Sequence, residues 1–228
     1  MVASPRWHTE LQALEPAQWP AYLHERSGLP GPRANTALVA AAATLAGAEV
    51  IDLLLADAQE YTAMCAAAAL GRRSEDPRAR ERARLLARDQ RWRVREGVAI
   101  GLQLLADEAP AALAPTVLAW ADDPDPLVQR AAAAAVCEPR LLRTAEAAAL
   151  AVEVCRRCTA GLLRVPALER RDRDVRTLRQ ALGYCWSVAV AADPEPGLLA
   201  FRALESTDPD VAWILAQNLR KKRLARLV

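Results

Sequence analysis

The sequence predicts an all-α protein and, more narrowly, a right-handed α-solenoid of about five antiparallel helix pairs. Two observations lead to this prediction. Hydrophobic residues make up 53% of the chain but aromatic residues only 4%, so alanine, leucine and valine supply most of the apolar content. Alanine and leucine favour helix, and residues typical of strands are scarce. In addition, capped apolar stripes recur along the chain at a spacing that is typical of helical repeats.

Helix starts are marked by Asp-Pro pairs, most of which lie directly before an alanine- and leucine-rich run. The pairs are Asp76-Pro77, Asp123-Pro124, Asp125-Pro126, Asp193-Pro194 and Asp208-Pro209. Aspartate accepts hydrogen bonds from the free amides of a first helical turn, and proline at the first helical position gives up no hydrogen bond. We therefore expect helices to begin at these pairs.

Four stripes of apolar residues follow in steps of three or four, so that each helix buries one side. The stripes are Val94, Val98, Leu102 and Leu105; Val128, Ala132, Ala135 and Val136; Val175, Leu178, Leu182 and Trp186; and Val211, Ile214, Leu215 and Leu219. Their leading valines lie 34, 47 and 36 residues apart. Such repetition indicates helical repeats, because each helix pair needs its neighbours to cover its apolar face.

The segments between the stripes supply the partner helices. We expect these near residues 33–46, 60–70, 77–87, 110–121, 145–163 and 197–204. Residues 1–30 contain four prolines and are expected to form an irregular N-terminal cap, followed by the solenoid over residues 31–228. Residues 165–174, which alternate arginine with acidic residues, are expected to form an exposed loop.

Two segments resemble the second helix of HEAT repeats, in which an Asp precedes a Val-Arg pair and small and apolar residues follow. The segments are DQRWRVREGVAIGL at residues 89–102 and DPDPLVQRAAAAAV at residues 123–136. Asp174 likewise leads directly into Val175-Arg176. The resemblance covers about residues 32–222. It implies stacked helix pairs whose inner helices form a concave face, and it implies architecture more than function.

A narrower resemblance is to bacterial DNA-alkylation-repair glycosylases, which are also built from HEAT-like helix pairs. DPLVQRAAAAAV, residues 125–136, looks like the family's helix with a phosphate-facing arginine, which would give that role to Arg130. LRQALGYCWSV, residues 178–188, is similar to the helix in which an aromatic follows glycine, which points to Tyr184. That family pairs a tryptophan with an aspartate four residues on, whereas here Trp92 is followed by Glu96. The resemblance therefore assigns no catalytic residue.

Positive charge gathers in residues 72–95, which hold ten arginines against four acidic residues, a net charge of +6. Arg91, Arg93 and Arg95 belong to this window, and residues 1–71 sum to −4 by contrast. Arginines on two successive helices can follow a phosphate backbone, and they can equally form a solvated, salt-bridged face. A second basic cluster, residues 220–226, can cap the last helix through its exposed carbonyls or contact phosphate.

Six tryptophans outnumber the single phenylalanine. Trp92, Trp120 and Trp213 lie near helix ends or off the apolar stripes, where a ring could stack on a ligand or fill the wedge between helix pairs. Arg95 and Arg176 follow the repeat valine directly, and Arg130 comes one place later. At these positions an arginine can bind a ligand or bond a neighbouring aspartate or carbonyl within the repeat.

Several kinds of chemistry lack their residues. Cys155 and Cys158 form one C-x-x-C within an expected long helix, and both histidines, His8 and His24, lie in the N-terminal cap. We therefore expect buried, reduced thiols, no metal site, no cofactor and no Ser-His or Cys-His pair. The most apolar stretch, residues 36–56, is interrupted by Glu49 and Asp52, so we expect no membrane segment and a cytoplasmic, bacterial protein.

The sequence thus favours a non-enzymatic scaffold whose concave face binds a protein partner, with nucleic acid left open as an additional ligand. The alternative is a DNA-binding protein similar to the alkylation-repair glycosylases. The candidate binding residues are Arg91, Trp92, Arg93, Arg95, Trp120, Arg130, Arg176, Tyr184 and Trp213. The sequence does not specify the ligand, the oligomeric state or the curvature of the repeats.

Overall fold

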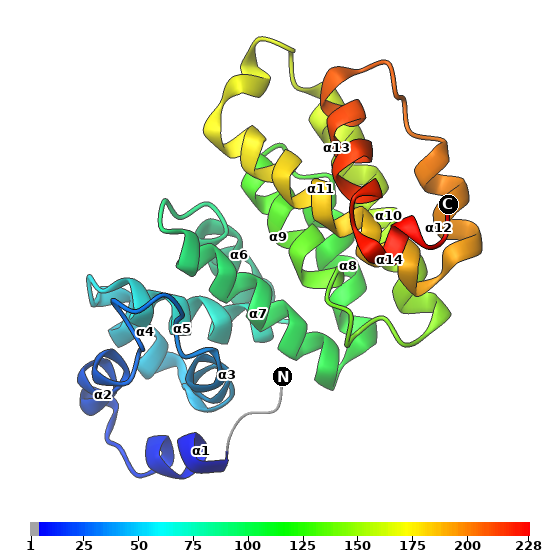
Figure 1. The fold of residues 1–228 in the computed structure, drawn as a ribbon. Helices are drawn as coiled ribbons and strands as arrows, with labels where there is room; N and C mark the ends of the chain where they lie inside the picture. The colour runs from blue at the N-terminus through cyan, green and yellow to red at the C-terminus, as the bar shows by residue number, and fades with distance from the viewer. Residues whose placement is uncertain (1–4) are drawn as a thin grey trace. The chain divides into compact units, whose positions relative to one another are not determined.

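The computed structural model describes residues 5–228, which form fourteen α-helices, two short 3₁₀ helices and no strand (Figure 1). The prediction of an all-α protein is confirmed. The α-helices are α1 (Pro5–Gln12), α2 (Trp19–Glu25), α3 (Thr36–Leu45), α4 (Ala48–Ala56), α5 (Glu60–Arg72), α6 (Pro77–Leu86), α7 (Trp92–Glu108), α8 (Pro110–Ala121), α9 (Pro126–Val136), α10 (Ala145–Arg164), α11 (Arg173–Ala192), α12 (Pro194–Arg202), α13 (Pro209–Leu219) and α14 (Lys222–Ala225). The 3₁₀ helices are η1 (Pro16–Gln18) and η2 (Glu169–Arg171).

The chain divides into two compact units. Unit 1 comprises Met1–Leu113 and unit 2 comprises Ala114–Val228, so the boundary falls inside α8. The solenoid expected over residues 31–228 stays a prediction. Each unit has its own buried apolar core, built around α5 in unit 1 and around α11 in unit 2.

The N-terminal segment differs from the expected irregular cap. Residues 1–4 of that segment lie outside the described residues, but α1, η1 and α2 occupy most of residues 5–25. Pro5 begins α1, Pro16 begins η1 and Pro20 lies in the first turn of α2. A proline in a first helical turn removes no intrahelical hydrogen bond, so these prolines start helices where we expected them to prevent helix formation.

The aspartate caps are largely as predicted. Asp76, Asp125 and Asp208 each accept a hydrogen bond from a backbone amide in the first turn of α6, α9 and α13. Asp193 precedes α12 but makes no side-chain cap bond. Asp123 begins no helix, because its carboxylate accepts from the amide of Asp125 at 2.9 Å and forms a turn ahead of α9.

The four apolar stripes are buried, with two exceptions near the C-terminus. Val94, Val98, Leu102 and Leu105 are at most 2% exposed, and the stripes on α9 and α11 are buried throughout. On α13, Val211 and Ile214 are fully buried, whereas Leu215 is half-buried and Leu219 is 43% exposed. Leu219 is the last residue of α13, where only α14 remains to cover it, so its assignment to the core was wrong.

Within each unit, every second helix packs on the next one in the series. In unit 1, α5 packs on α3 and α7, with α4 and α6 beside it. In unit 2, α11 lies between α9 and α13, with α10 and α12 against it (Figure 1). This alternation leaves part of α11 exposed to solvent, and α14 contacts α11 near the exposed Tyr184. Residues 165–174, predicted to be an exposed loop, are mostly exposed and include η2.

The contact between α5 and α7 is made by small residues. A Cβ atom on Gly97 or Gly101 of α7 would collide with the backbone oxygen of Met64 or Ala68 on α5. A Cβ on Gly71 would lie 2.7 Å from the carbonyl oxygen of Val98. The two backbones therefore approach one another directly, with no side chain between them at these points. This pair of helices forms the centre of unit 1.

No helix among residues 5–228 is both long enough and apolar enough to cross a membrane.

Candidate binding surface

The predicted binding residues fall into both units. Arg91, Trp92, Arg93 and Arg95 lie at the start of α7 in unit 1, and the other five lie in unit 2. The structure therefore divides the candidates between the two units. Within unit 2, Arg176 and Tyr184 share α11, and Trp213 lies on the neighbouring α13. Arg130 lies half-buried on α9, and Trp120 is the last residue but one of α8.

Two of the candidates are structural residues. Trp120 is 3% exposed and packs in the core, so its placement does not support ligand contact. Arg95 is 8% exposed, and its Nη1 donates to the carbonyl oxygens of Asp89 at 2.6 Å and Gln90 at 3.1 Å. Gln129 occupies the corresponding place in the first turn of α9, where its Nε2 donates to the carbonyl oxygen of Asp123 at 2.6 Å. Both side chains tie the start of a helix to the turn that precedes it.

The start of α7 is organised by Asp89. The Asp89 carboxylate accepts from Nε and Nη2 of Arg91 at 2.9 and 2.7 Å and from the Arg91 amide at 2.8 Å. These hydrogen bonds from Arg91 lower the pKa of Asp89 below its ordinary value. Arg93 pairs with Glu60 at 2.9 Å and stacks on Trp92 at 4.7 Å from the ring centroid. Trp92 is 54% exposed, so the indole is accessible from solvent.

Most arginines of the basic window are already bound within unit 1. Pairs with carboxylates are made by Arg72, Arg82, Arg84, Arg91 and Arg93. Arg73, Arg80 and Arg95 donate to backbone carbonyls. These contacts favour the salt-bridged interpretation of the window over a continuous phosphate-binding stripe, because a nearby carboxylate partly neutralises the charge of each paired guanidinium and occupies some of its N–H donors.

Unit 2 presents a different surface on α11, α13 and α14. We call it the aromatic-cation surface, and it consists of Arg176, Arg179, Tyr184, Trp213, Lys221 and Arg223. Arg176, Gln180 and Tyr184 follow one another in steps of four, which places them on one side of α11. Arg176 and Gln180 are exposed and Tyr184 is 42% exposed. α14 contacts this side of α11 through Arg223 at Tyr184, and the three side chains of α11 still remain exposed.

Tyr184 is surrounded by cations from the C-terminal segment. The guanidinium of Arg223 lies 4.9 Å from the ring centroid, and its Nη2 donates to the Tyr184 hydroxyl at 3.1 Å. The Lys221 ammonium lies 5.8 Å from the same centroid. A cation near an aromatic face is attracted by the negative charge of the π-system. The ring therefore holds two positive charges at the surface.

Trp213 forms a second pair with Arg179. The Arg179 guanidinium lies 4.7 Å from the indole centroid and also pairs with Asp210 at 2.5 Å. The six-membered ring packs close to Gly183, where an added Cβ would lie 2.8 Å from Cζ3. Gly183 is therefore required for the position of Trp213. The indole is half-buried as a result.

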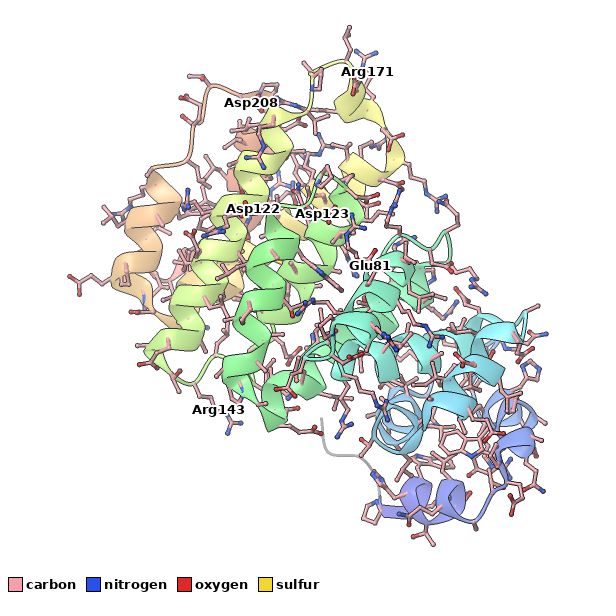
Figure 2. The ribbon with its side chains drawn as sticks, turned by 180° about the vertical axis from the view of Figure 1, so that it is seen from behind. Glu81, Asp122, Asp123, Arg143, Arg171 and Asp208 are labelled. Atoms are coloured by element: carbon pink, nitrogen blue, oxygen red, sulfur yellow. The ribbon has the colours of Figure 1, made fainter. Side chains whose placement is uncertain are left out.

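A carboxylate network borders this surface at the start of α13. Arg170 pairs with Asp208 at 2.6 Å and with Asp210 at 3.5 Å. Burial raises the pKa of Asp208, but the hydrogen bond from Arg170 and those from backbone amides outweigh it and the pKa is lowered. Figure 2 shows Asp122, Asp123 and Asp208 toward the end of unit 2 opposite Arg143. The turns before α9 and α13 thus carry acidic residues.

Sequence reasoning missed three members of the surface. Arg179, Lys221 and Arg223 were not among the candidates, and the C-terminal basic cluster was interpreted first as a helix cap. The structure places Lys221 and Arg223 over Tyr184 because α14 packs on α11 and α13. The repeat spacing of 36 residues between Val175 and Val211 predicts that α13 lies beside α11. It does not predict that the chain turns after Leu219 and forms α14.

Two pockets lie one in each unit. A pocket of about 540 Å³ in unit 2 is lined by acidic and apolar residues, without an aromatic ring in that lining: Pro126, Val165, Leu168, Glu169, Asp172, Asp174 and Val175. Asp172 there caps α11 by accepting from the amide of Asp174 at 2.8 Å. A pocket of about 390 Å³ in unit 1 includes Arg93 and Glu60, which pair with each other.

The thiols are buried, as the sequence predicted. Four of them lie in unit 2, on three helices or their ends: Cys137, Cys155, Cys158 and Cys185. The Sγ atoms of Cys137 and Cys155 are 3.6 Å apart, and burial raises the pKa of Cys158. Within residues 5–228, no group of three or more His, Cys, Asp or Glu side chains has an arrangement that could hold a metal ion.

We expect the ion pairs of α10 to make unit 2 sensitive to acid. Glu153 accepts from Arg156 at 2.7 Å and from Arg157 at 2.6 Å, and these bonds lower the pKa of Glu153 to about 2. A lowered folded-state pKa gives stability that is present above the unfolded pKa of about 4.3 and is lost as the pH falls toward about 2. The melting temperature of Glu153→Gln should therefore fall less between about pH 5 and about pH 2 than that of the wild type.

The control for this measurement is Glu195→Gln, because Glu195 is exposed at the start of α12. This variant should keep the acid sensitivity of the wild type. If Glu153→Gln and the wild type lose melting temperature in parallel, the pairs of Glu153 with Arg156 and Arg157 do not contribute to stability.

Comparisons of the chain with protein-family models, curated proteins and solved structures found no significant match.

Proposed function

We propose that this chain is a non-enzymatic helical-repeat scaffold of HEAT type, in which exposed sides of alternate helices bind a protein partner. On this proposal its helix pairs belong to a right-handed α-solenoid, and in unit 2 the exposed sides of α11 and α13 contribute to the concave face. The packing of α3 on α5 and α5 on α7, and of α9 on α11 and α11 on α13, supports this architecture.

The observation that supports binding is the exposed side of α11. A helix at the centre of a unit is expected to be covered by its neighbours, but Arg176, Gln180 and Tyr184 remain open to solvent there. Aromatic residues and arginine are enriched at protein interfaces because they provide large contact areas together with hydrogen bonds. Tyr184 is one such aromatic, and the exposed Trp92 offers a second in unit 1.

Site-specific photo-crosslinking tests the proposal. A photoreactive amino acid is introduced at Gln90, before α7, or at Gln180, on α11, since both positions are exposed. The purified protein is irradiated in an extract of its source cells, and adducts are identified by mass spectrometry. We expect a discrete protein adduct from at least one of these positions.

A photoreactive residue at Glu195 is the matched control. Glu195 is exposed on α12, which packs on α11 through Phe201 and Trp186. Trp186 and Tyr184 are two positions apart, so they point to nearly opposite sides of α11 at about 100° per residue. The same adducts from Glu195, or no protein adduct from Gln90 and Gln180, would contradict a partner-binding scaffold.

The alternative function is a DNA-binding protein related to the alkylation-repair glycosylases. The specific observation in its favour is the position of Lys221 and Arg223 around Tyr184, the residue to which the sequence resemblance assigns a role. This alternative requires duplex DNA binding that weakens steeply with salt. It also requires release of an alkylated base from damaged duplex. Binding without base release would leave a DNA-binding module, and no binding at low salt would eliminate the alternative.

A further inference from the structure

We propose that the aromatic-cation surface of unit 2 binds an acidic segment of a protein, a short stretch rich in aspartate and glutamate. This inference rests on the proposed scaffold function and specifies where and what the scaffold binds. It concerns Arg176, Tyr184, Lys221 and Arg223 directly, with Arg179 and Trp213 as the supporting pair.

Charge complementarity is the first argument. Among the described residues, no carboxylate lies within ion-pair distance of Arg176, Lys221 or Arg223, whereas Arg179 is paired with Asp210. Unpaired cations that share one exposed surface attract an anionic partner and steer its approach. Arg220 and Lys222 lie in the same C-terminal segment and add to the positive charge.

Preorganisation is the second argument. An exposed arginine or lysine normally loses side-chain conformational freedom when it binds a carboxylate. Here the Tyr184 ring already holds Arg223 at 4.9 Å and its hydroxyl accepts from the guanidinium at 3.1 Å. One hydrogen bond from Arg223 to Tyr184 leaves further N–H groups of the guanidinium fork for a carboxylate. The tyrosine thus reduces the entropy lost on binding.

The state of the aromatic rings favours an acidic peptide over nucleic acid. Single-stranded nucleic acid is bound by rings whose faces are open for base stacking. Tyr184 carries cations near its ring, and Trp213 is covered by Arg179 and packed near Gly183. A carboxylate-rich segment binds through the cations themselves and does not need an open ring face.

Fluorescence anisotropy with the purified full chain tests the proposal. The probe is a labelled peptide of alternating Glu and Gly, compared with the same peptide in which Gln replaces each Glu. We expect the Glu peptide to bind, the Gln peptide to bind much more weakly, and the affinity to fall as salt is added. Arg223→Ala should weaken binding of the Glu peptide by about five- to tenfold, since a hydrogen bond to a charged group is lost.

Two further variants separate charge from position. Tyr184→Phe keeps the ring but removes the hydroxyl that accepts from Arg223, so we expect a smaller loss of about two- to threefold. Arg202→Ala removes an equal charge from α12, which packs on the opposite side of α11 from Tyr184. Arg202→Ala should bind like the wild type. Circular dichroism confirms that each variant is folded.

The outcomes distinguish this inference from the proposed function. The inference is overturned if the Glu peptide does not bind, or if Arg202→Ala weakens binding as much as Arg223→Ala. It is also overturned if an oligonucleotide of equal net charge binds this surface more tightly than the peptide, which would identify a nucleic-acid site. Protein adducts from Gln90 or Gln180 together with a negative peptide result would retain the scaffold function and refute only the acidic-segment site.

Discussion

Replacing Gly101 by alanine should lower the free energy of unfolding of unit 1 by about 3 kcal/mol, because overpacking a close contact costs about this much. The added Cβ would collide with the carbonyl oxygen of Ala68 and would lie 2.8 Å from the amide nitrogen of Arg72. Both are backbone atoms of α5, so no side chain can rotate away. Alanine is favoured over glycine in a helix by about 1 kcal/mol, so a net loss shows that the collision outweighs propensity.

Thermal and urea unfolding monitored by circular dichroism would measure this loss. Gly47→Ala is the matched control, because no atom lies within 4 Å of a Cβ built on Gly47. Gly47 is the N-cap of α4, where alanine costs less than about 1 kcal/mol relative to glycine. Equal stability of Gly101→Ala and the wild type would show that α5 and α7 can separate freely, contrary to the direct approach of their backbones.

Replacing Asn218 by alanine should destabilise unit 2 by about 2–4 kcal/mol, because buried polar groups would lose their partners. Asn218 is fully buried, and its Nδ2 donates to the carbonyl oxygens of Leu182 at 2.9 Å and Ile214 at 2.8 Å. Its Oδ1 accepts from the amide of Ser187 at 2.8 Å. Alanine would break all three bonds and leave a cavity between α11 and α13.

Urea unfolding compares this variant with Gln217→Ala, which removes a longer, half-buried amide from the adjacent position. Gln217→Ala should change the free energy of unfolding by less than about 1 kcal/mol. Comparable losses in the two variants would mean that the buried position of Asn218 has no special contribution. A loss confined to Asn218→Ala would show that this side chain fixes α13 against α11.

The helices were predictable because their signals are local. Asp76, Asp125 and Asp208 combine a capping carboxylate with a proline in the first turn, and the structure begins a helix after each of them. The buried stripe from Val94 to Leu105 follows from helical periodicity alone. The same local reasoning failed for Leu219, because its burial depends on whether another helix follows to cover it.

The prolines of the N-terminal segment show the limit of a residue-type argument. Four prolines predicted irregular structure, yet Pro5, Pro16 and Pro20 lie in first turns of helices. Proline interrupts a helix only in its interior, and sequence composition does not reveal which turn a proline will occupy. The division of the chain falls inside α8 next to Pro115, but a proline inside a helix does not by itself indicate a boundary between two compact units.

The candidate site was only partly predictable because its contacts join distant segments. The glycosylase resemblance pointed to Tyr184, and Trp213 was a candidate because it lies near a helix end or off the apolar stripes. The C-terminal cations were assigned first to helix capping, and Arg179, which directly follows Leu178, was given no role. Arg223 lies 39 residues after Tyr184, so sequence alone does not bring the two together. For Arg95, the sequence left ligand binding and an internal bond open, and the two carbonyl bonds support the internal role.

The small residues between α5 and α7 also affect the entropy of folding. Alanine and glycine have no side-chain rotamers to lose, so ordering this interface carries almost no side-chain entropic cost. Leucine or methionine in the same places would gain apolar contact but would lose rotational freedom. From Ala66 to Ala69 the buried residues of α5 are all alanine. The close approach of the α5 and α7 backbones is therefore reached with little loss of side-chain entropy.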